Sequence, residues 1–231
     1  MTPLAVIEGA AIPGRLAPTT LKVENGNLVA LVGPNGGGKT SLLRAIAGVE
    51  EAQGIVRVEG ERVDEAAPNR RARLVGLLPA SRELVWPVAV RDLVAMGAMA
   101  LDALPSVLAD FDLEALADTP VDRLSTGERS RVLLARLVAA APRLLLLDEP
   151  LSNLDPYWVI RALDLIEAQV RGGGGAAIVS VHDLHQVGRF DRVIAIANGQ
   201  VAFDGEPKEF FESSVLRTVF QVGREDGRYI I

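Results

Sequence analysis

The feature that most constrains this chain is a glycine-rich segment between a strand and a helix. Residues 33–40 read G-P-N-G-G-G-K-T, and the apolar run at residues 27–32 precedes them. Residues 39–49 then show the periodicity of a helix, with Gly48 near its end. Glycines let several backbone N–H groups converge on phosphate oxygens at a helix N-terminus. We therefore expect a P-loop and a nucleoside triphosphate as its ligand.

Further predicted elements favour a mainly parallel sheet. A short hairpin strand and its turn are expected at residues 54–60, and strands at 73–78, 144–147 and 176–181. A helix is expected at 155–170 and a hairpin at 193–203. Helical patterns dominate residues 87–142. The predicted fold class is α/β, a P-loop NTPase with a mainly parallel sheet core, antiparallel β elements and an inserted helical subdomain. Within one domain over 1–231, we assign 1–79 and 138–231 to the nucleotide-binding core and about 80–137 to the helical subdomain.

Composition narrows the available chemistry. The chain has no cysteine and only two histidines, which excludes disulfides and thiolate catalysis and disfavours a structural metal site. The net charge of −6 argues against nucleic acid as the main partner, because phosphate backbones require clustered positive charge. No apolar run approaches the ~18 residues that a membrane span needs, and the first residues lack a signal-peptide pattern. We expect a globular chain that stays where it is made.

Two carboxylates follow the apolar strand at residues 144–147. Asp148 and Glu149 stand at the carboxyl end of that strand, where ligands sit in open parallel sheets. Together with the P-loop they predict that Lys39 reaches the terminal phosphates and that Thr40 and Asp148 hold Mg²⁺. Glu149 can then orient or deprotonate the attacking water. Each motif has a structural alternative. The glycine-rich segment could be a turn that only begins a helix, and Asp148 and Glu149 could be solvent-facing acids at the end of a buried strand.

Three other features have plain structural explanations. Ser125 precedes a helix whose first turn holds Glu128, which is the pattern of a helix cap. The glycines at 172–175 precede a strand and lack a following Lys-Ser/Thr pair, which indicates a turn between helix and strand. A single histidine just after a strand, such as His182, is usually structural, and we assign His185 to the surface.

Taken together, the motifs resemble the nucleotide-binding subunit of ATP-binding-cassette (ABC) transporters over nearly the whole chain. In order they are the P-loop, L-S-T-G-E at 124–128, D-E at 148–149, S-N-L-D at 152–155 and S-V-H-D at 180–183. The resemblance implies an ATPase with ATP and Mg²⁺ as cofactors, acting as a head-to-tail homodimer with ATP at the interface. It implies Lys39, Glu149 and His182 as catalytic residues and Thr40 and Asp148 as metal ligands. The implied ATP contacts are Gly33, Pro34, Asn35, Gly36, Gly37, Gly38, Lys39, Thr40, Ser41, Ser125, Thr126, Gly127, Glu128 and Asp155.

The same resemblance implies partners and a location. The single-domain chain and its segment 87–97 look most like importers of iron chelates, haem or cobalamin. Such an ATPase would pair with integral membrane permease subunits, bind no nucleic acid, and be cytoplasmic and peripheral on the inner face of the cell membrane. Within the dimer, Ser125 and Gly127 would contact the γ-phosphate, Asp155 would link the two sites, and His182 would sense the γ-phosphate.

Three positions depart from the family pattern. Thr126 replaces the first glycine of the usual L-S-G-G, and a β-branched residue restricts the backbone there. The adenine-stacking aromatic has no candidate before Trp86, which leaves Ile12 or Arg15 to cover the base. Ala80 stands where a glutamine is expected, and a methyl group can neither ligate Mg²⁺ nor bond water. We expect slow but real hydrolysis.

Three functions remain open at this level. The first is the ATPase motor of a membrane transporter. The second is a non-transport relative that works on DNA, RNA or ribosomes, which the acidic net charge opposes. The third is a regulatory or weakly active nucleotide-binding module, which the three departures favour. Turnover separates the third from the first, and co-purification with a polytopic membrane protein separates the first from the second.

Overall fold

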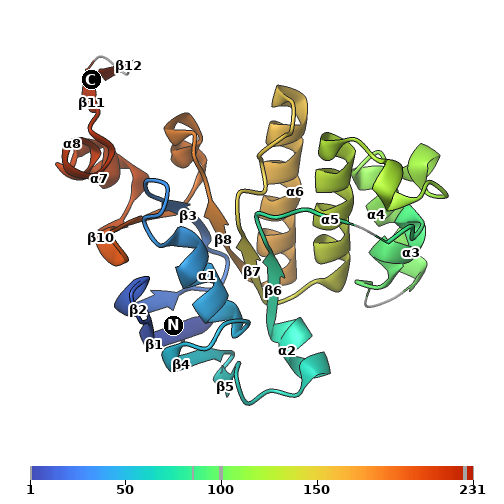
Figure 1. Cartoon of the computed structure of the whole chain (residues 1–231), viewed down its shortest axis with the longest axis horizontal. Coiled ribbons are helices and arrows are strands. Elements are labelled where there is room, and N and C mark those ends of the chain that lie inside the picture. Colours follow the sequence, from blue (N-terminus) through green and yellow to red (C-terminus); the bar gives the residue numbers. More distant parts are fainter. Residues whose placement is uncertain (1, 85, 99–100, 226–227, 231) are drawn as a thin grey trace.

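A six-stranded sheet forms the centre of the molecule (Figure 1). The computed structural model describes residues 2–84, 86–98, 101–225 and 228–230. The strand order is β10-β9-β3-β8-β7-β6, and all neighbours are parallel except β10, which pairs antiparallel with β9. The expected mainly parallel sheet is therefore confirmed. Its strands are β3 (Leu28–Val32), β6 (Val75–Leu78), β7 (Leu144–Leu147), β8 (Ala176–Ser180), β9 (Arg192–Ala197) and β10 (Gln200–Gly205).

A second, antiparallel sheet has the order β2-β1-β4-β5. The sequence patterns do not predict its first two strands. The register of β1 shifts twice against β2, and Gly9 in β1 has φ 63°. Strand β2 contains Pro18. Neither strand therefore shows the regular alternation of apolar and polar residues by which a strand is predicted. The strands are β1 (Ala5–Ile12), β2 (Leu16–Val23), β4 (Gln53–Val58) and β5 (Glu61–Arg62).

Helices and short helical turns make up most of the remaining structure. Between residues 87 and 142 the described residues form helices, turns and one isolated bridge between Ala89 and Pro120, as the patterns predict. Over the described residues, no helix combines the length and apolar character that crossing a bilayer requires. The helices are α1 (Lys39–Ala47), α2 (Pro68–Leu74), α3 (Val90–Ala95), α4 (Leu104–Asp110), α5 (Thr126–Ala140), α6 (Pro156–Gly173), α7 (Pro207–Glu212) and α8 (Val215–Phe220). The shorter elements are the 3₁₀ turns η1 (Leu101–Ala103), η2 (Glu114–Leu116), η3 (Val121–Arg123) and η4 (Leu184–Arg189), and a terminal hairpin of β11 (Gly223–Glu225) and β12 (Arg228–Ile230).

The central sheet is buried on both faces, as strands of a parallel sheet usually are. In β3, Ala30 and Val32 join the core that α5 and α6 cover, whereas Val29 and Leu31 join the core formed with α1 and the antiparallel sheet. Figure 1 shows α6, α5, α4 and α3 following one another away from β7. Because the inner strands are parallel, the segments that follow β3, β6, β7 and β8 all emerge at the same edge of the sheet.

Two predicted boundaries are wrong. Strand β6 starts at Val75 rather than at residue 73, because Arg73 and Leu74 complete α2. The glycines at 172 and 173 are the last residues of α6, and only Gly174, with φ 66°, leaves the helix as its left-handed cap. The remaining predicted elements lie where the patterns indicate, including the β9–β10 turn, whose Asn198 and Gly199 have φ 51° and 71°.

Candidate functional site

The glycine loop packs tightly between β3, β9 and α1. A Cβ at Gly33 would lie 2.1 Å from the carbonyl oxygen of Ile196 in β9, so no side chain fits there. Gly38 is the N-cap of α1 with φ 112°, a left-handed conformation that favours glycine. Residues 33–38 therefore bring the N-terminus of α1, with its partial positive charge, to the edge where the parallel strands end.

Lys39 turns back onto this loop. Its Nζ donates hydrogen bonds to the carbonyl oxygens of Gly33 at 2.8 Å and Pro34 at 3.1 Å, and only 6% of the residue is exposed. Burial lowers the pKa of Lys39, while the charges of Glu149 and Asp148 oppose that shift. The loop thus holds an ammonium against neutral acceptors, which is a suitable arrangement for exchanging them for anionic oxygens.

A chain of hydrogen bonds links the ends of three neighbouring elements. Asp148 is buried after β7, and its Oδ2 accepts from Thr40 Oγ1 at 2.7 Å. Its Oδ1 accepts from Ser180 Oγ at 2.8 Å, and Ser180 Oγ in turn accepts from the Glu149 N–H at 2.7 Å. Ser180 was not a predicted site residue, although its place at the end of β8, next to β7, is the signal that could have identified it.

Glu149 and His182 form a second contact at this edge. The distance between Glu149 Oε1 and His182 Nε2 is 2.7 Å, and both side chains are partly exposed. Glu149 has φ 51°, an uncommon conformation for a residue with a side chain. Asp148 is thus occupied by two hydroxyl groups inside the protein, while Glu149 faces the solvent beside a histidine.

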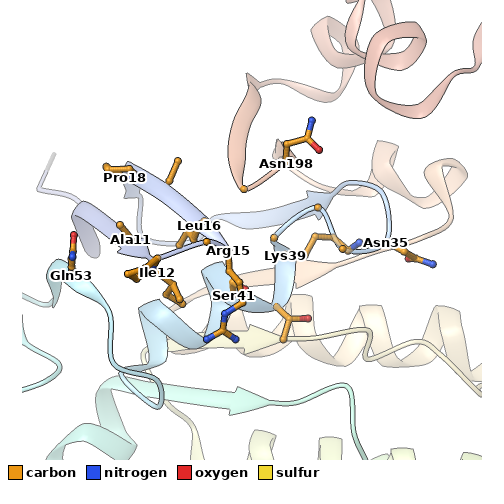
Figure 2. A pocket seen from close by; sticks show the side chains of 18 of the residues that line it. Ala11, Ile12, Arg15, Leu16, Pro18, Asn35, Lys39, Ser41, Gln53 and Asn198 are labelled. Carbon is orange, nitrogen blue, oxygen red and sulfur yellow. The ribbon is translucent and has the colours of Figure 1, made fainter.

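A cleft of about 1070 Å³ is lined by Lys39, Thr40, Glu149 and His182 (Figure 2), whereas Asp148 and Ser180 are buried and do not line it. Figure 2 shows Arg15 and Leu16 near Lys39, with Ile12 to one side of them and Asn35 to the other. Of the two candidates for covering a base, Ile12 is only 3% exposed, whereas Arg15 is exposed and forms an ion pair with Glu50. The lining combines the β1–β2 connection with its flanking residues, the P-loop, the pair of Glu149 and His182, the β9–β10 turn and one residue of β4. Its residues are Ala11, Ile12, Pro13, Gly14, Arg15, Leu16, Ala17, Pro18, Asn35, Gly36, Gly37, Gly38, Lys39, Thr40, Ser41, Gln53, Glu149, His182, Asn198 and Gly199.

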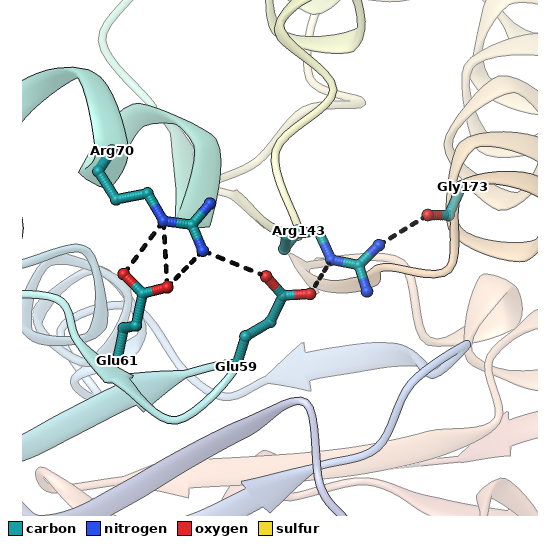
Figure 3. A network of polar contacts seen from close by, with 5 residues as sticks. All are labelled: Glu59, Glu61, Arg70, Arg143 and Gly173. Carbon is teal, nitrogen blue, oxygen red and sulfur yellow. Dashed lines mark hydrogen bonds and ion pairs between the residues drawn. The ribbon is translucent and has the colours of Figure 1, made fainter.

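A separate charged network lies at the other edge of the sheet (Figure 3). Arg143, which precedes β7, donates to Glu59 at 2.6 Å and to the carbonyl oxygen of Gly173 at 2.8 Å. Arg70 of α2 pairs with Glu61 at 2.5 Å and with Glu59 at 3.6 Å. The carboxylates are all paired with arginine and lie near the surface, so the network ties β4–β5, β7 and α6 together rather than forming a site.

Several predicted site residues do not line the cleft. Ser125 Oγ accepts from the Glu128 N–H at 3.3 Å and Glu128 Oε2 accepts from the Ser125 N–H at 2.8 Å, which makes a capping box on α5. The hydrogen bonds from Ser125 lower the pKa of Glu128. Asp155 caps α6 by accepting from the Trp158 N–H at 2.9 Å. The helix-cap explanation for Ser125 is confirmed, and Thr126 and Gly127 form the first turn of the same helix.

The position of the missing glutamine is exposed. Ala80 follows β6 and its side chain does not line the cleft. Two residues later, however, the side chain of Arg82 turns inward and donates to the backbone oxygens of Glu149 and Ser152. No pattern in the sequence predicts this contact.

The comparison with known families decides the identity. A family model described as ABC transporter matches residues 16–152, more than half of the chain. The chain belongs to the ABC transporter family. Two relatives are named "Hemin import ATP-binding protein HmuV". The one from Streptomyces coelicolor is 37% identical over 87% of this chain and 75% of its own length, and the one from Bordetella avium is 35% identical over 90% and 86%.

Solved structures agree with this ABC assignment. One described as the ATP binding subunit of an ABC transporter has a TM-score of 0.82 and 25% identity, covering 94% of this chain and 95% of its own. A dimeric post-hydrolysis ATP-binding cassette bound to ADP and Pi has a TM-score of 0.77 at 21% identity, covering 88% and 98%, and shares the fold. The predicted α/β fold, ATP ligand and ATPase activity are therefore confirmed for this ABC chain.

Proposed function

We propose that this chain is the ATP-hydrolysing subunit of a membrane importer whose cargo is hemin. The observation that carries the proposal is a hydrogen-bonded set in which the buried Asp148 and Ser180 join Thr40 to Glu149. Thr40 and Glu149 line the same cleft as Lys39. Among iron chelates, haem and cobalamin, hemin is favoured because relatives at 35–37% identity carry it in their names. Uptake of labelled hemin by membrane vesicles that contain the chain and its permease tests this proposal.

Phosphate binding falls to the P-loop in this proposal. The backbone N–H groups of residues 35–41 and the N-terminus of α1 would hold the phosphates, because the helix dipole favours negative charge there. Lys39 would exchange its contacts with the carbonyl oxygens of Gly33 and Pro34 for charge-assisted bonds to phosphate oxygens. These bonds would strengthen as charge develops on the transferring group.

The donor set beside the P-loop fits Mg²⁺. The Thr40 hydroxyl and the Asp148 carboxylate are hard oxygen donors with 2.7 Å between Oγ1 and Oδ2. The described residues contain no group of three or more His, Asp or Glu side chains suited to a metal. That agrees with the usual binding of Mg²⁺ by one or two carboxylates together with substrate phosphates. When bound, Mg²⁺ would neutralise charge on the terminal phosphates.

Activation of water falls to Glu149. Asp148 is buried and already accepts two hydroxyl hydrogen bonds, which leaves Glu149 as the carboxylate facing the cleft. We propose that Glu149 orients the attacking water and accepts its proton. His182, 2.7 Å from Glu149 Oε1, would hold that carboxylate in place and contact the γ-phosphate. A retained set of this kind opposes the regulatory-module alternative.

Residues away from the cleft support a role in a dimer. Ser125, Thr126, Gly127 and Glu128 begin α5, and Asp155 begins α6, outside the cleft of their own chain. We propose that they complete the ATP site of a second copy packed head to tail. Residues 80–137 would then move as the helical subdomain against the core formed by 1–79 and 138–231.

The proposed partners follow from the proposed role. ATP hydrolysis by the chain would power transport through integral membrane permease subunits. The chain would lie on the cytoplasmic side, peripheral to the membrane. The net charge of −6 supports the absence of a nucleic-acid partner.

Base selectivity is expected to be weak. An aromatic platform for a base is worth about 1–3 kcal/mol, and Arg15 offers only a guanidinium plane, tied to Glu50. We predict that ATP and GTP bind within about tenfold of each other, since ~1.4 kcal/mol is one factor of ten. Arg15→Ala should weaken both nucleotides by a similar factor. Titration calorimetry with both nucleotides measures this.

The matched control is Arg57→Ala, which removes a surface arginine of β4 that pairs with Glu8 instead of lining the cleft. A hundredfold preference for ATP would contradict the prediction and show that other groups read the adenine.

A further inference from the structure

Arg82 joins three parts of the molecule that the sequence separates widely. Its Nη1 donates to the Ser130 hydroxyl of α5 at 2.5 Å and to the Ser152 carbonyl oxygen at 2.8 Å. Its Nη2 donates to the carbonyl oxygen of Glu149. A single guanidinium thus connects the segment after β6, the first half of α5 and the turn that carries Glu149.

The turn at residues 149–153 needs such support. Glu149 and Asn153 both have positive φ, 51° and 65°, in the region that residues with side chains seldom adopt. The Ser152 hydroxyl and N–H also donate to the Glu149 carbonyl oxygen, at 2.9 and 3.1 Å. The conformation of Glu149 is therefore fixed through its backbone, with Ser180 on the N–H and Arg82 and Ser152 on the carbonyl group.

The environment of Arg82 is unusual for a surface segment. Its side chain is partly buried, and among the described residues its Nε has no hydrogen-bond partner and its three acceptors are all neutral oxygens. Burial lowers the pKa of Arg82, and the charges of Glu149 and Asp148 oppose that shift. Ser130 is 1% exposed and its hydroxyl also donates to the Thr126 carbonyl oxygen at 2.9 Å. The arginine therefore bonds to a hydroxyl that is itself anchored to the first turn of α5.

We propose that Arg82 is a positioning residue that couples the orientation of α5 to the position of the Glu149 carboxylate. When α5 turns relative to the sheet, Ser130 moves with it and displaces the Arg82 guanidinium through their hydrogen bond. The guanidinium then shifts the backbone of residues 149–152 through its bonds to Glu149 and Ser152. Glu149 thus reaches its working position only when α5 is correctly placed. The inference rests on the proposed role of Glu149 in hydrolysis and adds the element that controls it.

The test compares variants of Arg82 in the full-length chain. Arg82→Ala should lower kcat by about 10²-fold, the loss expected when a reacting group is misplaced by about 1 Å. The Kd for ATP should stay within about twofold, because Arg82 does not line the cleft. Added guanidinium ions should restore part of the lost kcat in Arg82→Ala. Ser130→Ala removes the link from Arg82 to α5, together with the hydrogen bond from Ser130 to Thr126 inside that helix, and leaves the bonds from Arg82 to Glu149 and Ser152 in place. It should give a smaller loss of kcat at unchanged Kd.

Glu83→Ala is the matched control, because Glu83 is the exposed next residue of the same segment, and it should behave as the natural chain. If Glu149→Gln is inactive while Arg82→Ala keeps full kcat, the coupling is wrong and the proposed function stands. If both variants keep full kcat, the role of Glu149 is wrong as well. A loss of ATP affinity equal to the loss of kcat, or no rescue by guanidinium, would also overturn the coupling and leave Arg82 a purely structural residue.

Discussion

Glu149→Gln is expected to lower kcat for ATP by at least about 10²-fold while ATP binding persists. General-base catalysis contributes about 10²–10⁴-fold, and an amide cannot accept the proton of the attacking water. The substitution keeps the size and shape of the side chain, and its amide oxygen can still accept a hydrogen bond from His182 Nε2, 2.7 Å from Oε1 in the natural chain. Phosphate release at saturating ATP gives kcat, and calorimetry gives the Kd.

Two further measurements sharpen this prediction. The variant should accumulate as a dimer with ATP, visible by light scattering, because the product of hydrolysis no longer forms. Glu206→Gln, which changes an exposed carboxylate that caps α7, is the matched control and should leave kcat unchanged. Full turnover in Glu149→Gln would assign the activation of water to another group.

Lys39→Ala should cost about 10–100-fold in ATP affinity. Each hydrogen bond to a charged group is worth about 1.5–3 kcal/mol, and ~1.4 kcal/mol corresponds to one factor of ten. The loss should be much smaller for adenosine, which has no phosphates for the ammonium to contact. Calorimetry with ATP and adenosine separates the phosphate contact from the rest of the site.

Lys39→Ala also removes a positive charge from the site when no nucleotide is bound. Lys39 is buried near Asp148 and Glu149, so its removal leaves their charges less compensated. Thermal unfolding must therefore accompany the titrations, so that lost binding is not mistaken for lost folding. Lys208→Ala, on the exposed side of α7, is the matched control. Unchanged ATP affinity in a folded Lys39→Ala variant would refute the assignment of the P-loop.

Local patterns were sufficient to predict the phosphate-binding region. Helix α1 begins at Lys39 and ends at Ala47, and Gly48, whose φ of 62° suits glycine, caps it. Both features could be predicted because periodicity and a terminal glycine are properties of neighbouring residues. The Asn198-Gly199 turn follows from the same kind of local preference. Where the local signal is irregular, as in β1 and β2, the prediction failed.

The contacts within the site lie beyond local patterns. Thr40 and Asp148 are 108 positions apart in the sequence, and Arg82 and Glu149 are 67 apart. The parallel order of β3, β8 and β7 brings the first pair together, so the position of Asp148 at a strand end was a useful guide. Arg82 follows the edge strand β6 in an irregular segment, where neither periodicity nor a motif indicates the direction of a side chain.

Two residues that cap helices are also proposed to contact a nucleotide on a second copy of the chain. Ser125 and Asp155 cap α5 and α6, so their side chains already have structural partners. The proposed dimer would use the same helix starts to contact a nucleotide on a second copy. Mutating either residue therefore affects stability and catalysis together, which makes Lys39 and Glu149 the better tests of the site.

The central claim is that ATP hydrolysis in this cleft drives hemin import, and uptake of labelled hemin tests it most directly. Right-side-out membrane vesicles containing the chain and its permease are loaded with Mg-ATP, and internal hemin is measured over time. The account predicts uptake that requires internal ATP and disappears when the chain carries Glu149→Gln, with labelled cobalamin not taken up. Hemin uptake that is the same with Glu149→Gln, or the same without ATP, would contradict the account.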